Sequence, residues 1–144
     1  MNAIEVLKED HRKVKKLFGQ YDSADGDKGE IVQSVFRELE MHTRVEEDIF
    51  YPAVRANSDK SGKGMIKHNF DEHQEFEDLI RELREMEVTG PDFDDKFEEL
   101  VEDVEHHIDL EESETFPMAE AVLGKQLEEL GREILEEKEV IKPR

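Results

Sequence analysis

His42-Thr-Arg-Val-Glu46-Glu47-Asp48-Ile49-Phe50-Tyr51-Pro52 is the stretch that decides the fold of this chain. A histidine and a glutamate four residues apart lie on one helical face, about 40° apart, with Cβ atoms roughly 5–6 Å apart. The pattern recurs sixty-five residues later as His107-Ile-Asp-Leu-Glu111-Glu112-Ser-Glu-Thr-Phe116-Pro117, and in both copies the proline follows the histidine by ten residues. Two matched pairs predict one shared site.

Length and composition predict one folded domain over residues 1–144, and the helical spacing of its apolar residues predicts an all-α fold. Charged residues make up 42% of the chain and hydrophobic residues 35%, but eight Phe and regular apolar spacing argue against disorder. There is no Cys, so disulfides, thiolate ligands and cysteine nucleophiles are excluded.

The charge and the apolar runs narrow the expected partners. A formal net charge of −20 disfavours nucleic acid and anionic membrane surfaces. No apolar run approaches the roughly 20 residues of a transmembrane helix, and the first residues do not form a basic, apolar signal sequence. A cytoplasmic protein without a nucleic-acid or membrane partner is therefore expected. The sequence predicts no oligomeric state.

Apolar spacing predicts four long amphipathic helices and a shorter fifth one. We expect them at about residues 3–21, 30–51, 65–86, 92–115 and 118–137. An Asn2-x-x-Glu5 pattern should open the first helix with a capping box, and Pro52 should kink or end the second. Tyr51, nine residues after His42, should then face the other side of that helix. Short loops favour an antiparallel up-down four-helix bundle over about residues 3–116, with the fifth helix packed outside it.

The sequence pattern of the first two predicted helices is repeated in the next two. Asp10-His11-x-x-Val14 aligns with Glu72-His73-x-x-Phe76, just as the two His-x3-Glu-Glu segments align with each other. This repeat predicts a pseudo-twofold site on the bundle axis.

Six polar residues interrupt the four apolar stripes, and they are the predicted metal ligands: His11, His42, Glu46, His73, His107 and Glu111. A single histidine on an apolar face is usually a hydrogen-bonded core residue, but that interpretation fits six residues in a matched arrangement poorly. Burying two carboxylates costs several kcal/mol each unless a positive partner compensates. The stripes carry no Lys or Arg, so the positive charge must come from a bound metal.

The ligand types indicate which metal. Four imidazoles and two carboxylates without sulfur suit iron, manganese or zinc. One zinc ion needs about four ligands, so six ligands around a pseudo-twofold axis predict two ions. If both carboxylates bridge the ions and an oxide or hydroxide bridge is added, two coordination positions stay open for oxygen-type chemistry.

Neighbouring residues leave alternatives to two of these ligands. His106 lies about 100° from His107 around the helix, and His106-x4-Glu111 is a competing geometry. His68 lies off the apolar stripe. Glu47 and Glu112 are expected to support the ligands or face solvent, although Glu112 could also replace Glu111.

The combined pattern, with Phe-Tyr-Pro or Thr-Phe-Pro after the paired glutamates, resembles the hemerythrin-like (HHE cation-binding) family over about residues 3–137. The resemblance implies a non-heme di-iron centre in a four-helix bundle, with Glu46 and Glu111 as bridges and the four histidines as terminal ligands; manganese or zinc is less expected. The ligand would be a small molecule such as O2, peroxide or NO.

The sequence departs from the oxygen-carrying hemerythrins at two positions. Those proteins carry a His-x3-His pair on the third helix, and here the first position is Asn69; they also close the site with His-x4-Asp, where this chain has His107-x3-Glu111. One imidazole fewer should open a further exchangeable position, which disfavours a reversible carrier. We therefore expect redox turnover of peroxide or another small oxidant, and the alternative is a module that binds or senses oxygen, nitric oxide or iron without turnover.

Overall fold

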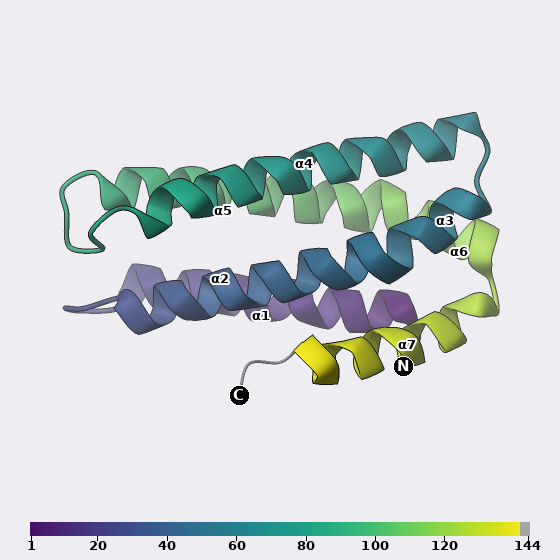
Figure 1. Cartoon of the computed structure of the whole chain (residues 1–144), viewed down its shortest axis with the longest axis horizontal. Coiled ribbons are helices and arrows are strands. Elements are labelled where there is room, and N and C mark those ends of the chain that lie inside the picture. The colour runs from purple at the N-terminus through teal and green to yellow at the C-terminus, as the bar shows by residue number, and fades with distance from the viewer. Residues whose placement is uncertain (142–144) are drawn as a thin grey trace.

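The computed structural model describes residues 1–141, and within that range it contains helices and no strand. The four longest helices are α1 (Ala3–Ser23), α2 (Gly29–Val45), α4 (Lys60–Arg84) and α5 (Phe93–Leu110). They lie side by side along the longest axis of the molecule, and each reverses the direction of the one before it (Figure 1). The all-α prediction is confirmed. No helix of the described part is long and apolar enough to cross a membrane.

Short segments extend α2 and α5 in the same way. A π-helical turn, η1 (Glu46–Phe50), links α2 to α3 (Tyr51–Ala56), and a second turn, η2 (Glu111–Thr115), links α5 to α6 (Phe116–Leu123). Pro52 was expected to kink or end its helix. The chain continues past Pro52 as helix α3, but the π turn η1 interrupts the regular α-helix just before it. Pro52 lies in the first turn of α3, where its missing N–H is tolerated.

Local signals set the other helix ends. The predicted capping box is present, because the Asn2 side chain accepts from the Glu5 backbone N–H over 3.0 Å and the Glu5 carboxylate accepts from Asn2 N–H over 2.9 Å. Helix α4 begins at Lys60 rather than near residue 65, because the Asp59 carboxylate caps it by accepting from Gly62 N–H.

The predicted fifth helix over residues 118–137 is wrong in its bounds. The first residues of this range, up to Leu123, belong to α6, and α7 spans Gln126–Ile141. Gly124 separates the two because its φ of 50° lies in the left-handed region, which a helix does not continue through. Helix α7 folds back along α1 and α2, as Figure 1 shows.

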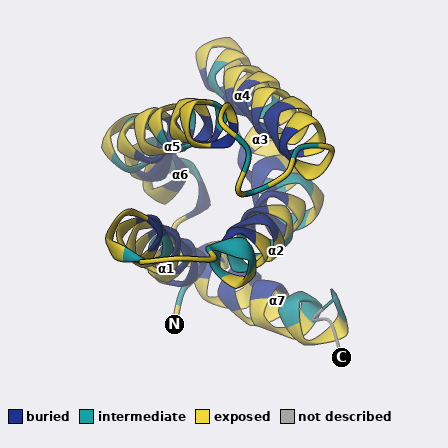
Figure 2. Cartoon of the chain, turned by 90° about the vertical axis from the view of Figure 1, so that its left-hand side faces the viewer, coloured by how far each residue is buried: buried dark blue, intermediate teal, exposed yellow. Residues whose placement is uncertain are grey.

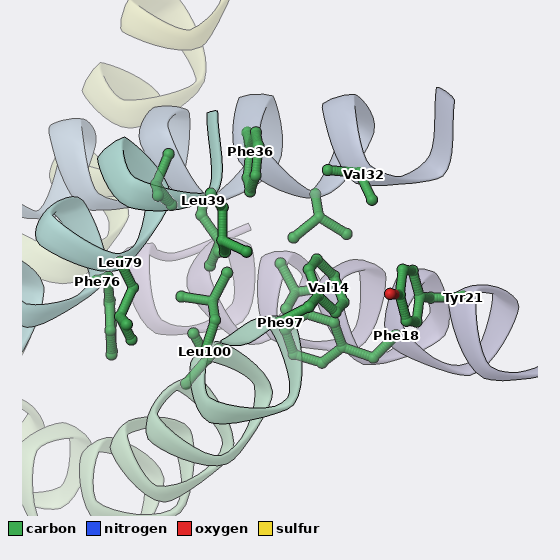
Figure 3. Close-up of a cluster of buried hydrophobic side chains, with 14 of the residues drawn as sticks. Val14, Phe18, Tyr21, Val32, Phe36, Leu39, Phe76, Leu79, Phe97 and Leu100 are labelled. Carbon is green, nitrogen blue, oxygen red and sulfur yellow. The ribbon is translucent and has the colours of Figure 1, made fainter. Parts of the chain in front are cut away.

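The helices turn their buried faces inward (Figure 2), and these faces form two apolar clusters. The first cluster, drawn in Figure 3, lies toward the loops that join α1 to α2 and α4 to α5, and includes Phe36, Phe97 and Leu100. The second gathers the start of α1 with α3, α6 and α7, and includes Leu7 and Phe50. A layer of buried polar residues separates the two clusters along every long helix.

Candidate metal centre

The six predicted ligands meet in the polar layer between the two apolar clusters. Each is at most 5% exposed, and both glutamates are fully buried. Helices α1 and α4 each supply one histidine, while α2 and α5 each supply a histidine and lead directly into the π turn that carries the glutamate. The structure thus brings together all six residues from four separated segments.

The ligand atoms fall into two groups that could each hold an ion. One group contains His11, His42, Glu46 and Glu111, and the other contains Glu46, His73 and His107. Glu46 belongs to both groups, and the atoms within each group lie within 4.8 Å of one another. This arrangement fits two neighbouring ions that share a carboxylate.

The distances are those expected of groups that converge on common ions. Glu46 Oε1 lies 3.0 Å from His42 Nε2 and 3.1 Å from His73 Nε2. Glu111 reaches both groups as well, because its Oε1 lies 3.0 Å from His11 Nε2 and its Oε2 lies 3.6 Å from His107 Nε2. Two ligand atoms about 2.1 Å from one tetrahedral ion are themselves roughly 3.4 Å apart.

Unpaired polar atoms show that a cation fits this layer. Both carboxylate oxygens of Glu46 and the Nε2 atom of His42 are buried without a hydrogen-bond partner. The short approaches of His42 and His73 to Glu46 therefore do not have hydrogen-bond geometry. Burying an ionised carboxylate without hydrogen bonds costs several kcal/mol, which a bound cation would offset.

Each histidine is also held from outside by a separate carboxylate. The contacts of the four Nδ1 atoms are with Glu112 for His11 (2.7 Å), Asp10 for His42 (2.9 Å), Glu47 for His73 (2.7 Å) and Glu72 for His107 (2.6 Å). A ring whose Nδ1–H donates to a carboxylate presents Nε2 as the free ligand and becomes more basic. All four Nε2 atoms face the two buried glutamates.

The alternatives left open by the sequence are separated by burial. His107 is 2% exposed and lies in the polar layer, whereas the side chain of His106 is 72% exposed. Glu112 and Glu47 contact the outer nitrogens of histidines and remain partly exposed, as expected of supporting residues.

Sequence reasoning missed the supporting carboxylates Asp10 and Glu72. Both directly precede a histidine in the repeated segment, so the repeat itself contained the signal. Each crosses to the histidine of the neighbouring helix instead of its own, and this makes the two halves of the site equivalent.

The placement of Tyr51 also differs from the sequence-based expectation. Its hydroxyl lies 2.5 Å from Glu111 Oε2 and 3.2 Å from His73 Nε2, inside the polar layer. A π turn adds a residue to the helix and so rotates every later side chain by about 100°. The turn η1 therefore brings Tyr51 from the far side of the helix to the centre.

The buried glutamates raise the pKa of His42, His73 and His107. Burial alone lowers the pKa of His107, but the nearby Glu111 carboxylate and the hydrogen bond to Glu72 outweigh it and raise the value to about 10. The pKa of His42 and that of His73 are raised in the same way against the effect of burial, mainly by Glu46. Without metal, these histidines hold protons that balance the carboxylates.

A small cavity adjoins the centre. It measures about 10 Å³ and touches His11, His42 and His107 together with apolar side chains such as Phe76 and Val104. That volume corresponds to about one water-sized molecule. The space beside the histidines therefore has room for one very small molecule and none for larger organic molecules.

An all-helical protein with a buried layer of histidines and carboxylates belongs to the class of helical metal-binding proteins. Within that class, the chain belongs to the hemerythrin family: residues 2–119 match the hemerythrin HHE cation binding domain. The predicted resemblance is confirmed, and family and site together indicate metal-ion binding.

Known proteins agree with this assignment over most of the chain. A crystal structure of a hemerythrin HHE cation binding domain-containing protein from Mycobacterium kansasii, a homologue of Rv2633c, superposes with a TM-score of 0.84 at 28% identity, covering 97% of this chain and 86% of that one. The Mycobacterium tuberculosis protein Rv2633c is 30% identical over 136 residues, which are 91% of this chain and 81% of that protein.

A longer relative contains only a similar segment. A Nostoc protein named DNA nickase is 29% identical over 118 residues, and the match covers 81% of this chain but only 33% of the Nostoc protein. The chain therefore spans about a third of that relative.

Proposed function

We propose that the chain binds two iron ions in the polar layer and uses them to react with a small oxidant, with hydrogen peroxide as the first candidate and O2 or NO as further ligands. The single observation that carries this proposal is the fully buried Glu46 carboxylate, which has no hydrogen bond and belongs to both ligand groups. His11 and His42 would bind one ion, His73 and His107 would bind the other, and Glu46 and Glu111 would be shared between the two ions. An oxide or hydroxide bridge between the ions belongs to the same proposal.

The scaffold of this proposal is an antiparallel four-helix bundle formed by α1, α2, α4 and α5. Helix α7 packs on its outside. In the bundle, α2 and α5 continue as π turns. In this proposal, the turns hold the bridging carboxylates and the Tyr51 hydroxyl in the same layer.

Bound iron would supply one-electron redox steps between its ferrous and ferric forms. The chain's own groups support this chemistry in three ways. The four outer carboxylates hold the imidazoles in position with Nε2 inward. The 10 Å³ cavity limits access to molecules of a few atoms, and Phe76 and Val104 line it with apolar surface. The Tyr51 O–H donates to Glu111 and so keeps one proton next to the centre.

Iron loading and peroxide consumption test the proposal. The protein would be loaded with ferrous iron without oxygen, assayed for iron per chain, and then followed by visible spectroscopy in air and by peroxide loss. We expect two iron ions per chain, a ferric absorption band that persists, and catalytic loss of peroxide. His42→Ala and His107→Ala should each lose iron, whereas His106→Ala should keep it because that side chain points outward.

The outcomes separate the proposal from its alternatives. Fewer than one ion per chain, or unchanged iron in the His42→Ala and His107→Ala proteins, would exclude the site. Two bound ions with no peroxide turnover, together with an oxygen spectrum that argon removes, would instead assign the chain to reversible binding.

A further inference from the structure

Two exposed histidines lie outside the centre but next to one of its supporting carboxylates. His68 on α4 and His106 on α5 place their Nε2 atoms 3.4 and 3.8 Å from the same atom, Glu72 Oε2. The other oxygen, Glu72 Oε1, contacts His107 Nδ1 over 2.6 Å. Glu72 therefore joins a surface pair of imidazoles to the buried centre through its two oxygens.

In the other half of the repeat, the carboxylate oxygen that does not contact a histidine of the centre has a positively charged partner. Asp10 is the counterpart of Glu72, and its Oδ2 contacts His42 Nδ1 while its Oδ1 forms an ion pair with Lys138 of α7. At the positions of His68 and His106, that half carries Val6 and Met41, which together with Lys138 line the surface around Asp10. One supporting carboxylate thus has a lysine cation, and the other has two imidazoles.

We propose that His68, His106 and Glu72 form a surface site for a divalent transition-metal ion, which receives iron on its way to the centre. Two imidazoles and one carboxylate are ligands that suit Fe²⁺ and Zn²⁺. Ligand atoms of one tetrahedral ion lie roughly 3.4 Å apart, and the 3.4 Å approach of His68 to Glu72 already fits this spacing. The three ligand atoms do not all lie within 4.8 Å of one another, so the two exposed imidazoles must shift toward each other to hold one ion.

Exposure makes such a shift easy. The side chains of His68 and His106 are 56% and 72% exposed, while that of Glu72 is 10% exposed and held in place by His107. The site therefore has one fixed ligand and two mobile ones that approach from different helices. An ordinary surface ion pair would account for one histidine next to Glu72, but not for two that face the same oxygen.

The surface site lies next to His107, and this position suggests its role in iron entry. The role in iron entry rests on the proposed iron centre. An ion held by Glu72 Oε2 is one carboxylate away from a predicted ligand of the centre. The equivalent route on the other half is covered by α7 and occupied by the Lys138 ammonium. Iron entering between α4 and α5 would meet two imidazoles at the surface.

Metal binding to the iron-loaded protein tests the surface site separately from the centre. Zn²⁺ would be titrated into iron-loaded wild type, the His68→Ala/His106→Ala double variant and a Gln74→Ala control, whose exposed side chain on α4 contacts Asp78 instead. Calorimetry should show one Zn²⁺ bound by wild type and control, and none by the double variant. Iron per chain and the visible spectrum should be equal in all three.

The rate of iron loading tests the entry role. At low micromolar ferrous iron, the double variant should fill its centre about tenfold more slowly than wild type while reaching the same final iron content. The proposal is overturned if the double variant binds Zn²⁺ with the wild-type stoichiometry, or if it loads iron at the wild-type rate. If the protein bound no iron at all, the one-equivalent difference in Zn²⁺ between wild type and double variant would still decide the surface site.

Discussion

The Tyr51 hydroxyl donates a 2.5 Å hydrogen bond to Glu111, whereas Phe116, its counterpart in the repeat, has no hydroxyl to donate. Both rings lie next to a histidine of the centre, since Tyr51 is 5.3 Å from the ring of His73 and Phe116 is 5.6 Å from that of His11. The two halves of the centre therefore have similar packing but differ in polarity. Any chemistry that needs a proton next to the centre should depend on the half with Tyr51.

Replacing Tyr51 by Phe removes this hydroxyl with little change in packing. We expect unfolding free energy to fall by about 1–3 kcal/mol, because a buried bond to a charged group is lost. The visible spectrum of the iron-loaded protein and its rate of peroxide loss should change as well. Urea unfolding and spectroscopy would measure these effects.

The matched control is Tyr21→Phe, which removes a buried hydroxyl that donates to Asp94 far from the centre. This variant should lose stability but keep the wild-type spectrum and rate. Equal spectra and rates in the two variants would show that the Tyr51 hydroxyl has no part in the chemistry.

A second prediction concerns the unpaired carboxylate of Glu46. In the metal-free protein, Glu46→Gln should change stability little, because removing the buried charge offsets the loss of its attraction to protonated His42 and His73, which can release their protons. In the presence of metal it should be destabilising, since metal at 100 times its Kd stabilises the wild type by about 2.7 kcal/mol through linkage and the variant loses this gain.

Thermal unfolding with and without Zn²⁺ would show this difference between the two states. Asp48→Asn is the control, because this side chain is 57% exposed on the same π turn and should respond weakly in both states. A metal-free Glu46→Gln protein that loses as much stability as the metal-loaded one would contradict the prediction.

The convergence of the six predicted ligands on one layer could be predicted because it depends on helical periodicity. A histidine and a glutamate at i and i+4 share one face of a helix independently of the rest of the chain. The repeat contains this pair twice, which strengthened the prediction. The all-helical fold followed from the same stripes.

Features that depend on a break in periodicity could not be predicted. Tyr51 was placed on the wrong side of the helix because no pattern of apolar residues predicts a π turn. Each π turn rotates all later side chains of the helix around its axis. The start of α4 was placed late because Asp59 caps a first turn that is polar and contains Gly62, with Gly64 directly after it. The role of Lys138 depends on the return of α7 across α1, which local sequence does not encode.

A third prediction follows from the raised pKa of the buried histidines. A group whose pKa is higher in the folded state stabilises fully below its unfolded pKa, here about 6.5, and loses this contribution as pH rises through the folded value. Because the pKa of His107 is raised to about 10, the metal-free protein should become less stable between pH 6.5 and 10. The Zn²⁺-loaded protein should change little, since its histidines are already deprotonated.

Urea midpoints measured across this range with and without Zn²⁺ provide the test. Metal binding should also release protons at pH 7 and become tighter as pH rises. A metal-free protein whose midpoint is constant from pH 6.5 to 10 would contradict the prediction.

The last prediction concerns the contact between α7 and the centre. Lys138 is 15% exposed and pairs with Asp10, which is 2% exposed and holds His42 through its other oxygen. Lys138→Met should therefore cost stability toward the lower end of the roughly 3–5 kcal/mol seen for broken buried pairs. It should also weaken metal binding by about tenfold or more, as expected when the support of a ligand is lost.

The matched control is Arg132→Met, which removes an exposed cation of the same helix that pairs with Glu129 and Glu136. Competition with a metal chelator would measure affinity in both variants. Arg132→Met should bind metal as wild type does, because its carboxylate partners contact no histidine of the centre. If Lys138→Met lost stability but kept wild-type affinity, α7 would stabilise the fold without positioning His42.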